Sequence, residues 1–128
     1  MGFEVFPGVI EPIGMIPGHT KIEGIERYLL LTRSSIPGTT FHIAAHVVSG
    51  RYEPGGEWRF TEPQEHEFDE LNILLPGAEG LRYRYEIDGV IHRIDGPCSV
   101  FISAGTRHRM EPLEGAGIFL CIQLNSEG

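Results

Sequence analysis

The sequence predicts an all-β protein whose strands form a single sandwich or barrel. Seventeen glycines and nine prolines are spread along the 128 residues and divide the chain into short segments. Several of these segments are rich in β-branched and aromatic residues, which favour strands. The dipeptide Asp88-Gly89 separates two alternating segments and is a strong signal for a two-residue hairpin. Short strands at regular spacing, joined by such turns, are typical of small β-sandwiches and barrels.

The predicted elements begin with an arm. Residues 1–20 contain three prolines and four glycines, so we expect an extended arm or an edge strand there. Residues 21–128 then form the barrel domain. The segment 24–34 is compatible with a short helix or a strand, whereas the later segments favour strands. The expected later strands are 41–50, 70–77, the hairpin 81–94, 98–103 and 117–124.

Composition excludes several classes of function. The formal net charge is −8, whereas a nucleic-acid surface needs a basic patch. No segment approaches the roughly 18 apolar residues of a membrane span, and the first residues lack the features of a signal peptide. The two cysteines stand in separate apolar segments, so we expect reduced thiols. A cytoplasmic protein without nucleic-acid or membrane partners is therefore expected.

Polar residues stand on the inner faces of two predicted strands. Glu70, Asn72 and Leu74 share one face of their strand, because side chains alternate along it. A carboxylate and an amide in a dry core are costly, unless that face lines a site that binds something. Further along the chain, His108 shares a face with Met110, while arginines occupy the opposite face and favour solvent. We therefore expect His108 to point inward.

Two stretches of the sequence resemble the two sequence motifs of the cupin superfamily. The first family motif reads G, five residues, H-x-H, three or four residues, E, six residues, G. The corresponding positions here are Trp58, Gln64, His66, Glu70 and Gly77, at the same spacing. Gln64 stands where the family usually has its first metal-binding histidine, and Trp58 replaces the leading glycine.

The second family motif reads G, five residues, P-x-G, two residues, H, three residues, N. The corresponding positions are Pro97, Ser103, Gly105, His108 and Pro112, of which Gly105 and His108 match. The resemblance spans residues 58 to 112, about half of the chain. The resemblance implies a single-domain cupin, which is a jelly-roll-like β-barrel.

The resemblance also implies a metal site inside the barrel. Metal-binding cupins hold one divalent metal with three histidines and one glutamate, and the matching residues here are His66, Glu70 and His108. Gln64 in the fourth position would be a weaker oxygen ligand, which lowers affinity and favours Mn or Fe. If Gln64 turns away, two histidines and one carboxylate remain, as in many non-haem iron oxygenases. Fe, Mn, Ni, Co and Zn all suit such ligand sets.

Further residues are candidates for the pocket walls. His42 and His46 share the less apolar face of their strand, so we favour an outer position or a subunit contact for both. The alternative is an acid–base role at the mouth of the cavity. We expect His19 and His92 at the surface. In the segment 81–85 (LRYRY), we expect the two tyrosines rather than the two arginines to point inward. Inward arginines would indicate a carboxylate or phosphate substrate. The candidate pocket residues are Asn72, Tyr83, Tyr85, Met110, His42, His46 and Trp58.

Two classes of function remain open at this point. The first is a metal-dependent enzyme of dioxygenase, isomerase or lyase type that acts on a small polar organic substrate inside the barrel. The alternative is a non-catalytic cupin that binds a metal or a small metabolite as a sensor or storage module. Inward histidine, tyrosine or arginine near the metal favours the enzyme, and a purely apolar cavity favours the binding module. The family resemblance and the extended arm also predict a homodimer.

Overall fold

The computed structural model describes residues 2–16, 19–50, 58 and 61–124 of the chain. Within these ranges, no helix is long and apolar enough to cross a membrane. Both cysteines are free thiols. The elements are β1 (Val9–Ile10), the 3-10 helix η1 (Ile13–Met15), β2 (Ile25–Leu31), β3 (His42–Val48), β4 (Asp69–Ile87), β5 (Val90–Asp95), β6 (Cys98–Ile102) and β7 (His108–Leu124).

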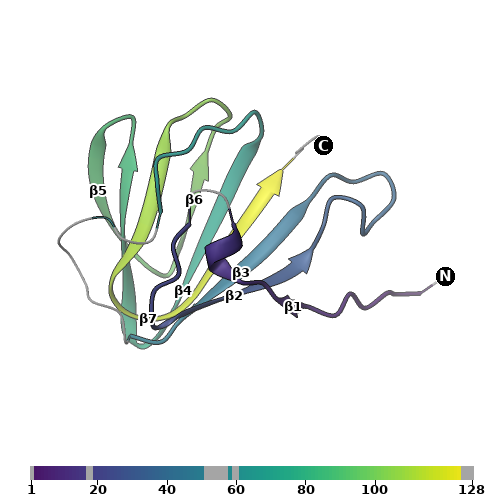
Figure 1. Ribbon diagram of the computed structural model, residues 1–128, viewed down its shortest axis with the longest axis horizontal. Coiled ribbons are helices and arrows are strands. Elements are labelled where there is room, and N and C mark those ends of the chain that lie inside the picture. The colour runs from purple at the N-terminus through teal and green to yellow at the C-terminus, as the bar shows by residue number, and fades with distance from the viewer. Residues whose placement is uncertain (1, 17–18, 51–57, 59–60, 125–128) are drawn as a thin grey trace.

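The strands form one antiparallel sheet in the order β1-β2-β3-β7-β4-β5, with β6 also paired to β4. Figure 1 shows β1, β2 and β3 on one side of the folded sheet and β5 and β6 on the other. The prediction of an all-β fold is confirmed. The segment 24–34, for which a helix was the other possibility, contains strand β2.

The hairpin predicted at Asp88-Gly89 is present. β4 and β5 pair up to Ile87 and Val90, so that Asp88 and Gly89 form a two-residue connection. Their φ angles are 46° and 84°, and both central residues of a type I′ turn need positive values. The Asp88 carboxylate also accepts a hydrogen bond of 3.1 Å from the backbone N–H of Arg107. The turn is thereby tied to the chain that enters β7.

The interior holds polar as well as apolar side chains. Tyr83 and Tyr85 of β4 are fully buried, which confirms the prediction that these tyrosines point inward. Tyr83 stacks on Phe119 of β7, with ring centroids 4.7 Å apart. Burial of a polar side chain is costly unless the side chain forms hydrogen bonds or faces a binding site. The buried polar side chains include Arg27, His46, Glu70, Asn72 and His108.

Strands β4 and β7 bend together near their middle. They pair along most of their length, with an interruption between Pro76 and Leu81. At this point Gly115 and Gly117 of β7 have φ angles of 91° and 153°. A Cβ on Gly115 would overlap the carbonyl oxygen of Gly80, and one on Gly117 would also overlap the backbone of β4. The close approach of the two backbones therefore requires glycine.

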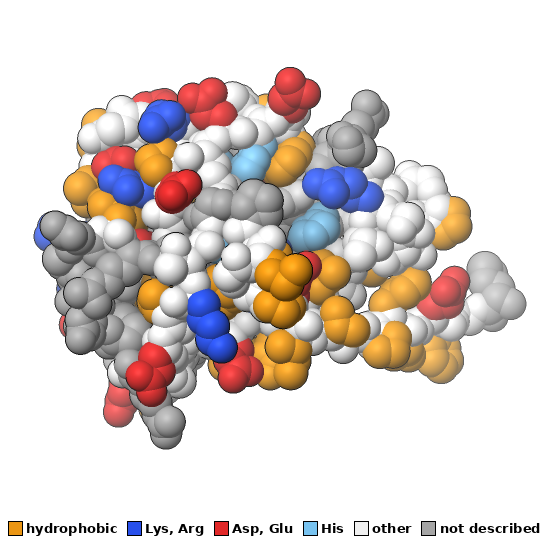
Figure 2. Space-filling model, viewed as in Figure 1, with side chains coloured by type: hydrophobic (Ala, Val, Ile, Leu, Met, Phe, Trp, Pro, Cys, Tyr) orange, Lys and Arg blue, Asp and Glu red, His pale blue; other side chains and the backbone are white. Residues whose placement is uncertain are grey.

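The described part of the arm lies at the edge of the sheet. β1 pairs with β2, and the backbone N–H of Glu11 donates a 2.9 Å hydrogen bond to the carbonyl of Arg27. Ile13 of η1 is buried in the core. Figure 2 shows apolar side chains gathered along this border of the molecule. The exposed apolar side chains of the arm are Phe3, Val5, Val9, Ile10 and Met15.

Candidate metal centre

Three potential metal ligands meet inside the sheet. One ligand atom from each of His66, Glu70 and His108 lies within 4.8 Å of the other two. Glu70 Oε1 is 3.9 Å from His66 Nε2 and 3.7 Å from His108 Nε2. These separations exceed those of hydrogen bonds. They suit atoms that each bind a shared ion from about 2.0–2.2 Å.

Local structure explains how residues distant in sequence come together here. Glu70 lies at the start of β4, and His108 is the first residue of β7. The loop that carries His66 is joined to the turn before β7 by a 2.8 Å hydrogen bond from Gly105 N to His66 O. The His66 ring stacks on Phe68, with centroids 4.6 Å apart. Backbone and ring contacts thus hold this loop residue beside the two strand residues.

Hydrogen bonds orient two of the three ligands. Asn72 Nδ2 donates to Glu70 Oε2 (2.9 Å), and Tyr85 OH donates to Asn72 Oδ1 (2.9 Å). Glu70 Oε1 is the oxygen that faces the histidines. His108 Nδ1 donates to the carbonyl of Thr106 over 2.8 Å, so Nε2 is the nitrogen that faces Glu70. Outer hydrogen bonds of this kind fix the tautomer and orientation of metal ligands.

The electrostatics of the centre favour an ionised Glu70. Burial opposes the charged form, but His108 and the hydrogen bond from Asn72 outweigh it and hold the pKa of Glu70 below its usual value. Burial lowers the pKa of His66, against the opposing effect of Glu70. For His108 burial also favours the neutral ring, yet Glu70 and the Thr106 carbonyl raise its pKa overall. A carboxylate surrounded by imidazoles is the charge pattern that a divalent cation requires.

Gln64 lies next to the three ligands. Its backbone exchanges two hydrogen bonds with that of His108, 2.7 Å and 2.9 Å long. Residues paired in this way across an antiparallel bridge project their side chains to the same side. Gln64 also lines the cavity that contains His66, Glu70 and His108. Gln64 therefore lies in the wall of the cavity that holds the three candidate ligands.

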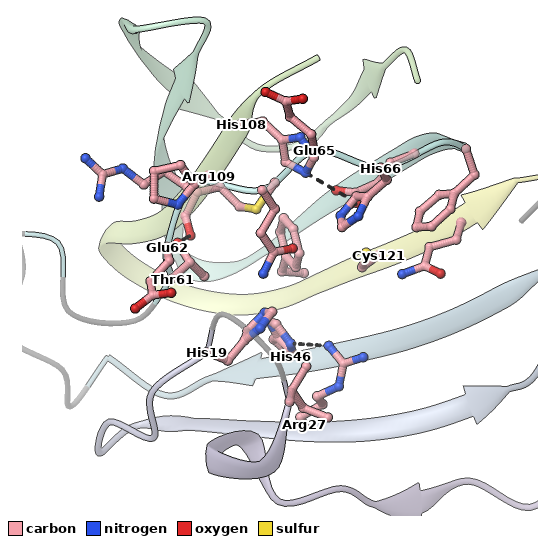
Figure 3. A pocket seen from close by; sticks show the side chains of 18 of the residues that line it. His19, Arg27, His46, Thr61, Glu62, Glu65, His66, His108, Arg109 and Cys121 are labelled. Carbon is pink, nitrogen blue, oxygen red and sulfur yellow. Dashed lines mark hydrogen bonds and ion pairs between the residues drawn. The ribbon is translucent and has the colours of Figure 1, made fainter. Parts of the chain in front are cut away.

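A cavity of about 700 Å³ opens onto the candidate metal centre. This volume suits a small organic ligand. Figure 3 shows His66 and His108 on one side of the cavity and His19, His46 and Arg27 on the other. Both walls therefore carry groups that can donate or accept hydrogen bonds.

The structure divides the remaining candidate pocket residues into three groups. Tyr83, Met110 and His46 line the cavity. Asn72 and Tyr85 are fully buried and act behind the wall, where they orient Glu70. The third group consists of His42 and Trp58, which do not line the cavity.

Trp58 lies between two arginines. The guanidinium carbons of Arg84 and Arg109 lie 4.1 Å and 4.2 Å from its ring centroid. Arg84 also pairs with Glu111, and Arg109 with Glu86. Cation–π contacts with two arginines explain the position of this indole. Trp58 itself does not line the cavity, although its neighbour Arg109 does.

Two expectations about histidines are wrong. His46 is 3 % exposed and faces the cavity, although the opposite face of its strand is the more apolar one. The reason is that Arg27 bonds to its Nε2 over 3.0 Å and Phe119 stacks on its ring, and both contacts offset part of the cost of burial. On the opposite face Val47 is 40 % exposed. His19, expected at the surface, also lines the cavity.

Several residues of the cavity wall were not predicted from the sequence. Arg27 follows Ile25 on the buried face of β2, and an arginine on an apolar strand face is a signal that was available. Arg33 and Gln123 bond to each other over 3.0 Å and both line the cavity, yet no motif marks them. Cys121 also lines the cavity, and burial raises the pKa of its thiol well above the usual value.

Solved structures share this fold, although no protein-family model and no curated protein matches the chain. KdgF from Halomonas sp. has 15% identity, and the alignment covers 85% of this chain and 86% of that one, with a TM-score of 0.57. An RmlC-like cupin from Shewanella frigidimarina has 17% identity, covers 93% and 85%, and has a TM-score of 0.58. The polyketide cyclase RemF from Streptomyces resistomycificus has 19% identity, covers 98% and 80%, and has a TM-score of 0.59. At such identities the likeness concerns the fold.

Proposed function

Because the chain has the cupin fold, we propose that it is a metal-dependent enzyme that acts on a small polar organic molecule inside the barrel. The metal ligands in this proposal are His66, Glu70 and His108, with Gln64 as a fourth ligand through its amide oxygen. Fe, Mn, Ni, Co and Zn are the candidate metals, and dioxygenase, isomerase and lyase reactions are the candidate chemistries.

One observation carries this proposal: the ligand atoms are already oriented toward one another. Glu70 is 4 % exposed, and burying its charge is costly unless a cation or several hydrogen bonds compensate for it. Asn72 satisfies one oxygen, and the other oxygen faces two imidazole nitrogens at 3.7 Å and 3.9 Å. A divalent cation among these three atoms satisfies all of them at once. The donor set therefore fits the proposed metal.

A divalent metal in this centre supplies a Lewis acid for a bound carbonyl or, as Fe(II), a centre that reacts with O₂. The residues of the chain position the substrate beside it. The stacked side chains of Tyr83 and Phe119 line the cavity. The His46 ring stacks on Phe119, and the buried position of these side chains excludes much of the water.

The polarity of the cavity favours an enzyme over a binding module. Histidine, tyrosine and arginine side chains line the cavity in addition to the three proposed ligands. Proton transfer and charge stabilisation depend on such groups. Solved structures of similar fold include proteins named as a polyketide cyclase and as DMSP lyases, so this architecture accommodates enzymes.

Metal analysis of the purified protein tests the proposal directly. We expect about one equivalent of a divalent transition metal per chain, by inductively coupled plasma mass spectrometry. His66→Ala and His108→Ala should each lose most of it, because each removes one of three or four ligands. The matched control is His92→Ala, which removes an exposed histidine of β5 and should retain the metal. A metal-free protein whose ligand binding ignores both site substitutions would contradict the proposal.

We also propose that two copies of the chain associate through the arm. Phe3 and Val5 are 90 % and 75 % exposed, and apolar side chains gathered on one border favour contact with a second copy. The double variant Phe3→Asp/Val5→Asp should sediment as a monomer in analytical ultracentrifugation. As a control, Val90→Asp/Ile91→Asp places the same charges on another exposed apolar pair, and it should remain a dimer. A wild-type monomer at micromolar concentration contradicts the proposal.

A further inference from the structure

Arg27 is a buried cation in the wall that faces the candidate metal centre. Its residue exposure is 6 %, and it lines the cavity. Its Nε donates to Glu11 Oε1 over 2.6 Å, and its Nη1 lies 3.0 Å from His46 Nε2. Among the described residues, these two contacts use Nε and Nη1 and leave the Nη2 protons to other acceptors. A guanidinium has five N–H donors in a rigid planar fork.

The contact with Arg27 also determines where His46 carries its proton. Arginine stays protonated in proteins and can only donate, so His46 Nε2 is the acceptor of this bond. The proton of the neutral ring is therefore on Nδ1. Burial, reinforced by Arg27 and His19, lowers the pKa of His46 well below the usual value and keeps the ring neutral at pH 7. His46 thus orients the Arg27 guanidinium at the cavity wall and adds no charge there.

The charges that line the cavity favour an anionic ligand once a metal is bound. Three arginines and three glutamates line it, so these residues sum to zero, and a divalent metal raises the sum to +2. The protein as a whole has a formal charge of −8. Glu11 and Glu86, which pair with Arg27 and Arg109 from outside the lining, reduce this sum, but the cavity remains less negative than the protein as a whole. The lining arginines are Arg27, Arg33 and Arg109, and the lining glutamates are Glu62, Glu65 and Glu70.

We propose that Arg27, oriented by His46, binds a carboxylate group of the substrate at the wall opposite the metal. The substrate is then a small organic acid that reaches the metal with one end and this wall with the other. The planar fork of Arg27 matches the two oxygens of a carboxylate. Glu11 already neutralises part of the charge of Arg27, so the wall suits a single negative charge better than a doubly charged phosphate. This inference rests on the proposed metal-dependent function.

A purely structural role for the Glu11–Arg27 pair makes a different prediction. Such a pair would anchor the arm to β2, and buried ion pairs add little net stability. It would not require the guanidinium to stand in the wall of a cavity or to bond to a histidine there. In that case, changes at either residue would alter unfolding but not the choice between ligands.

The test compares two 2-hydroxy acids that differ at the far end. Calorimetric titration of the Mn²⁺-loaded protein uses malate, which carries a second carboxylate, and 2-hydroxybutyrate, which carries a methyl group there. We expect malate to bind about tenfold more tightly, as charge-assisted hydrogen bonds allow. Arg27→Gln should abolish this preference while the metal content stays at that of the wild type. Equal affinities in the wild type, or an unchanged preference in Arg27→Gln, would overturn the proposal.

Two further variants separate recognition from folding. Glu11→Gln removes the carboxylate that neutralises Arg27, so the preference for malate should increase even though the protein loses an ion pair. An unchanged or smaller preference would count against the proposal, and this result does not depend on whether Arg27→Gln folds. The matched control is Arg82→Gln, because Arg82, like Arg27, forms an ion pair at 2.6 Å, but its side chain is exposed. Its preference should equal that of the wild type.

Further measurements distinguish the ligand source and the role of the metal. A terminal phosphate in place of the carboxylate, as in 3-phosphoglycerate, should bind more weakly than malate, and tighter binding would overturn the carboxylate assignment. In chelator-treated protein, succinate should still raise the melting temperature in an Arg27-dependent way. If no metal binds but this shift is present, the proposed enzyme function fails and the carboxylate site stands. If metal binds and the shift is absent, the carboxylate site fails.

Discussion

The Gln64→His variant is expected to bind a divalent transition metal about tenfold or more tightly than the wild type, since an imidazole nitrogen is a better ligand than an amide oxygen. The backbone of residue 64 is fixed by two hydrogen bonds to His108, which aim its side chain to the side of His108. The new imidazole would complete a set of three histidines and one glutamate. Competition with a fluorescent chelator for Zn²⁺ or Ni²⁺ measures the change. The gain should be smallest for Mn²⁺, because that ion favours oxygen ligands.

A matched control keeps the new histidine away from the centre. Glu67 lies in the same loop, its side chain is exposed, and it does not line the cavity. Glu67→His therefore adds an imidazole without adding a ligand, and its metal affinity should equal that of the wild type. Equal affinities in Gln64→His and the wild type would mean that residue 64 is not a ligand. The proposed site would then have three protein ligands.

Gly115→Ala is expected to destabilise the protein by about 3 kcal/mol or more, the largest effect we expect on stability. The φ angle of 91° is unfavourable for alanine, and its Cβ would overlap the carbonyl oxygen of Gly80. The overlap cannot be relieved by turning a side chain, because the Gly80 carbonyl and the added Cβ are both fixed to the backbone of the sheet. Urea unfolding monitored by circular dichroism measures the change in the free energy of unfolding.

Gly38→Ala provides the control for this prediction. Gly38 has a similar φ of 83°, but nothing lies within 4 Å of an added Cβ. Its substitution therefore carries the conformational cost alone, about 1 kcal/mol. Similar losses in Gly38→Ala and Gly115→Ala would show that the close approach of β4 and β7 contributes little. That result would contradict the steric account of the bend.

The strands and turns could be predicted because their signals are local. The alternation of LRYRY set Tyr83 and Tyr85 on one face, and Asp88-Gly89 marked the turn by its conformational freedom. The three proposed ligands could be predicted for another reason. They stand at spacings that resemble a family motif, so the resemblance supplied a contact that no local pattern contains.

The opposite wall could not be predicted because it depends on contacts distant in sequence. His46 is buried because it contacts Arg27 and Phe119. Arg27 lies 19 positions before it in the sequence, and Phe119 lies far after it. From the sequence of β3 alone, its more apolar face is the one expected to point into the core. Hydrophobicity of a single strand cannot determine its orientation when polar partners from other strands satisfy its polar face.

Because β4 bends, this one strand supplies both the candidate ligand Glu70 and the residues that orient it. Before the bend the strand supplies Glu70 and Asn72, and after it the same strand supplies Tyr85, whose hydroxyl returns to Asn72. The bend therefore sets the distance between the two halves of β4. Substitutions at the bend, remote from any ligand, are expected to alter that distance and thereby change the geometry of the metal centre. Glycines of the bend belong among the positions to vary when the metal preference of this protein is to be changed.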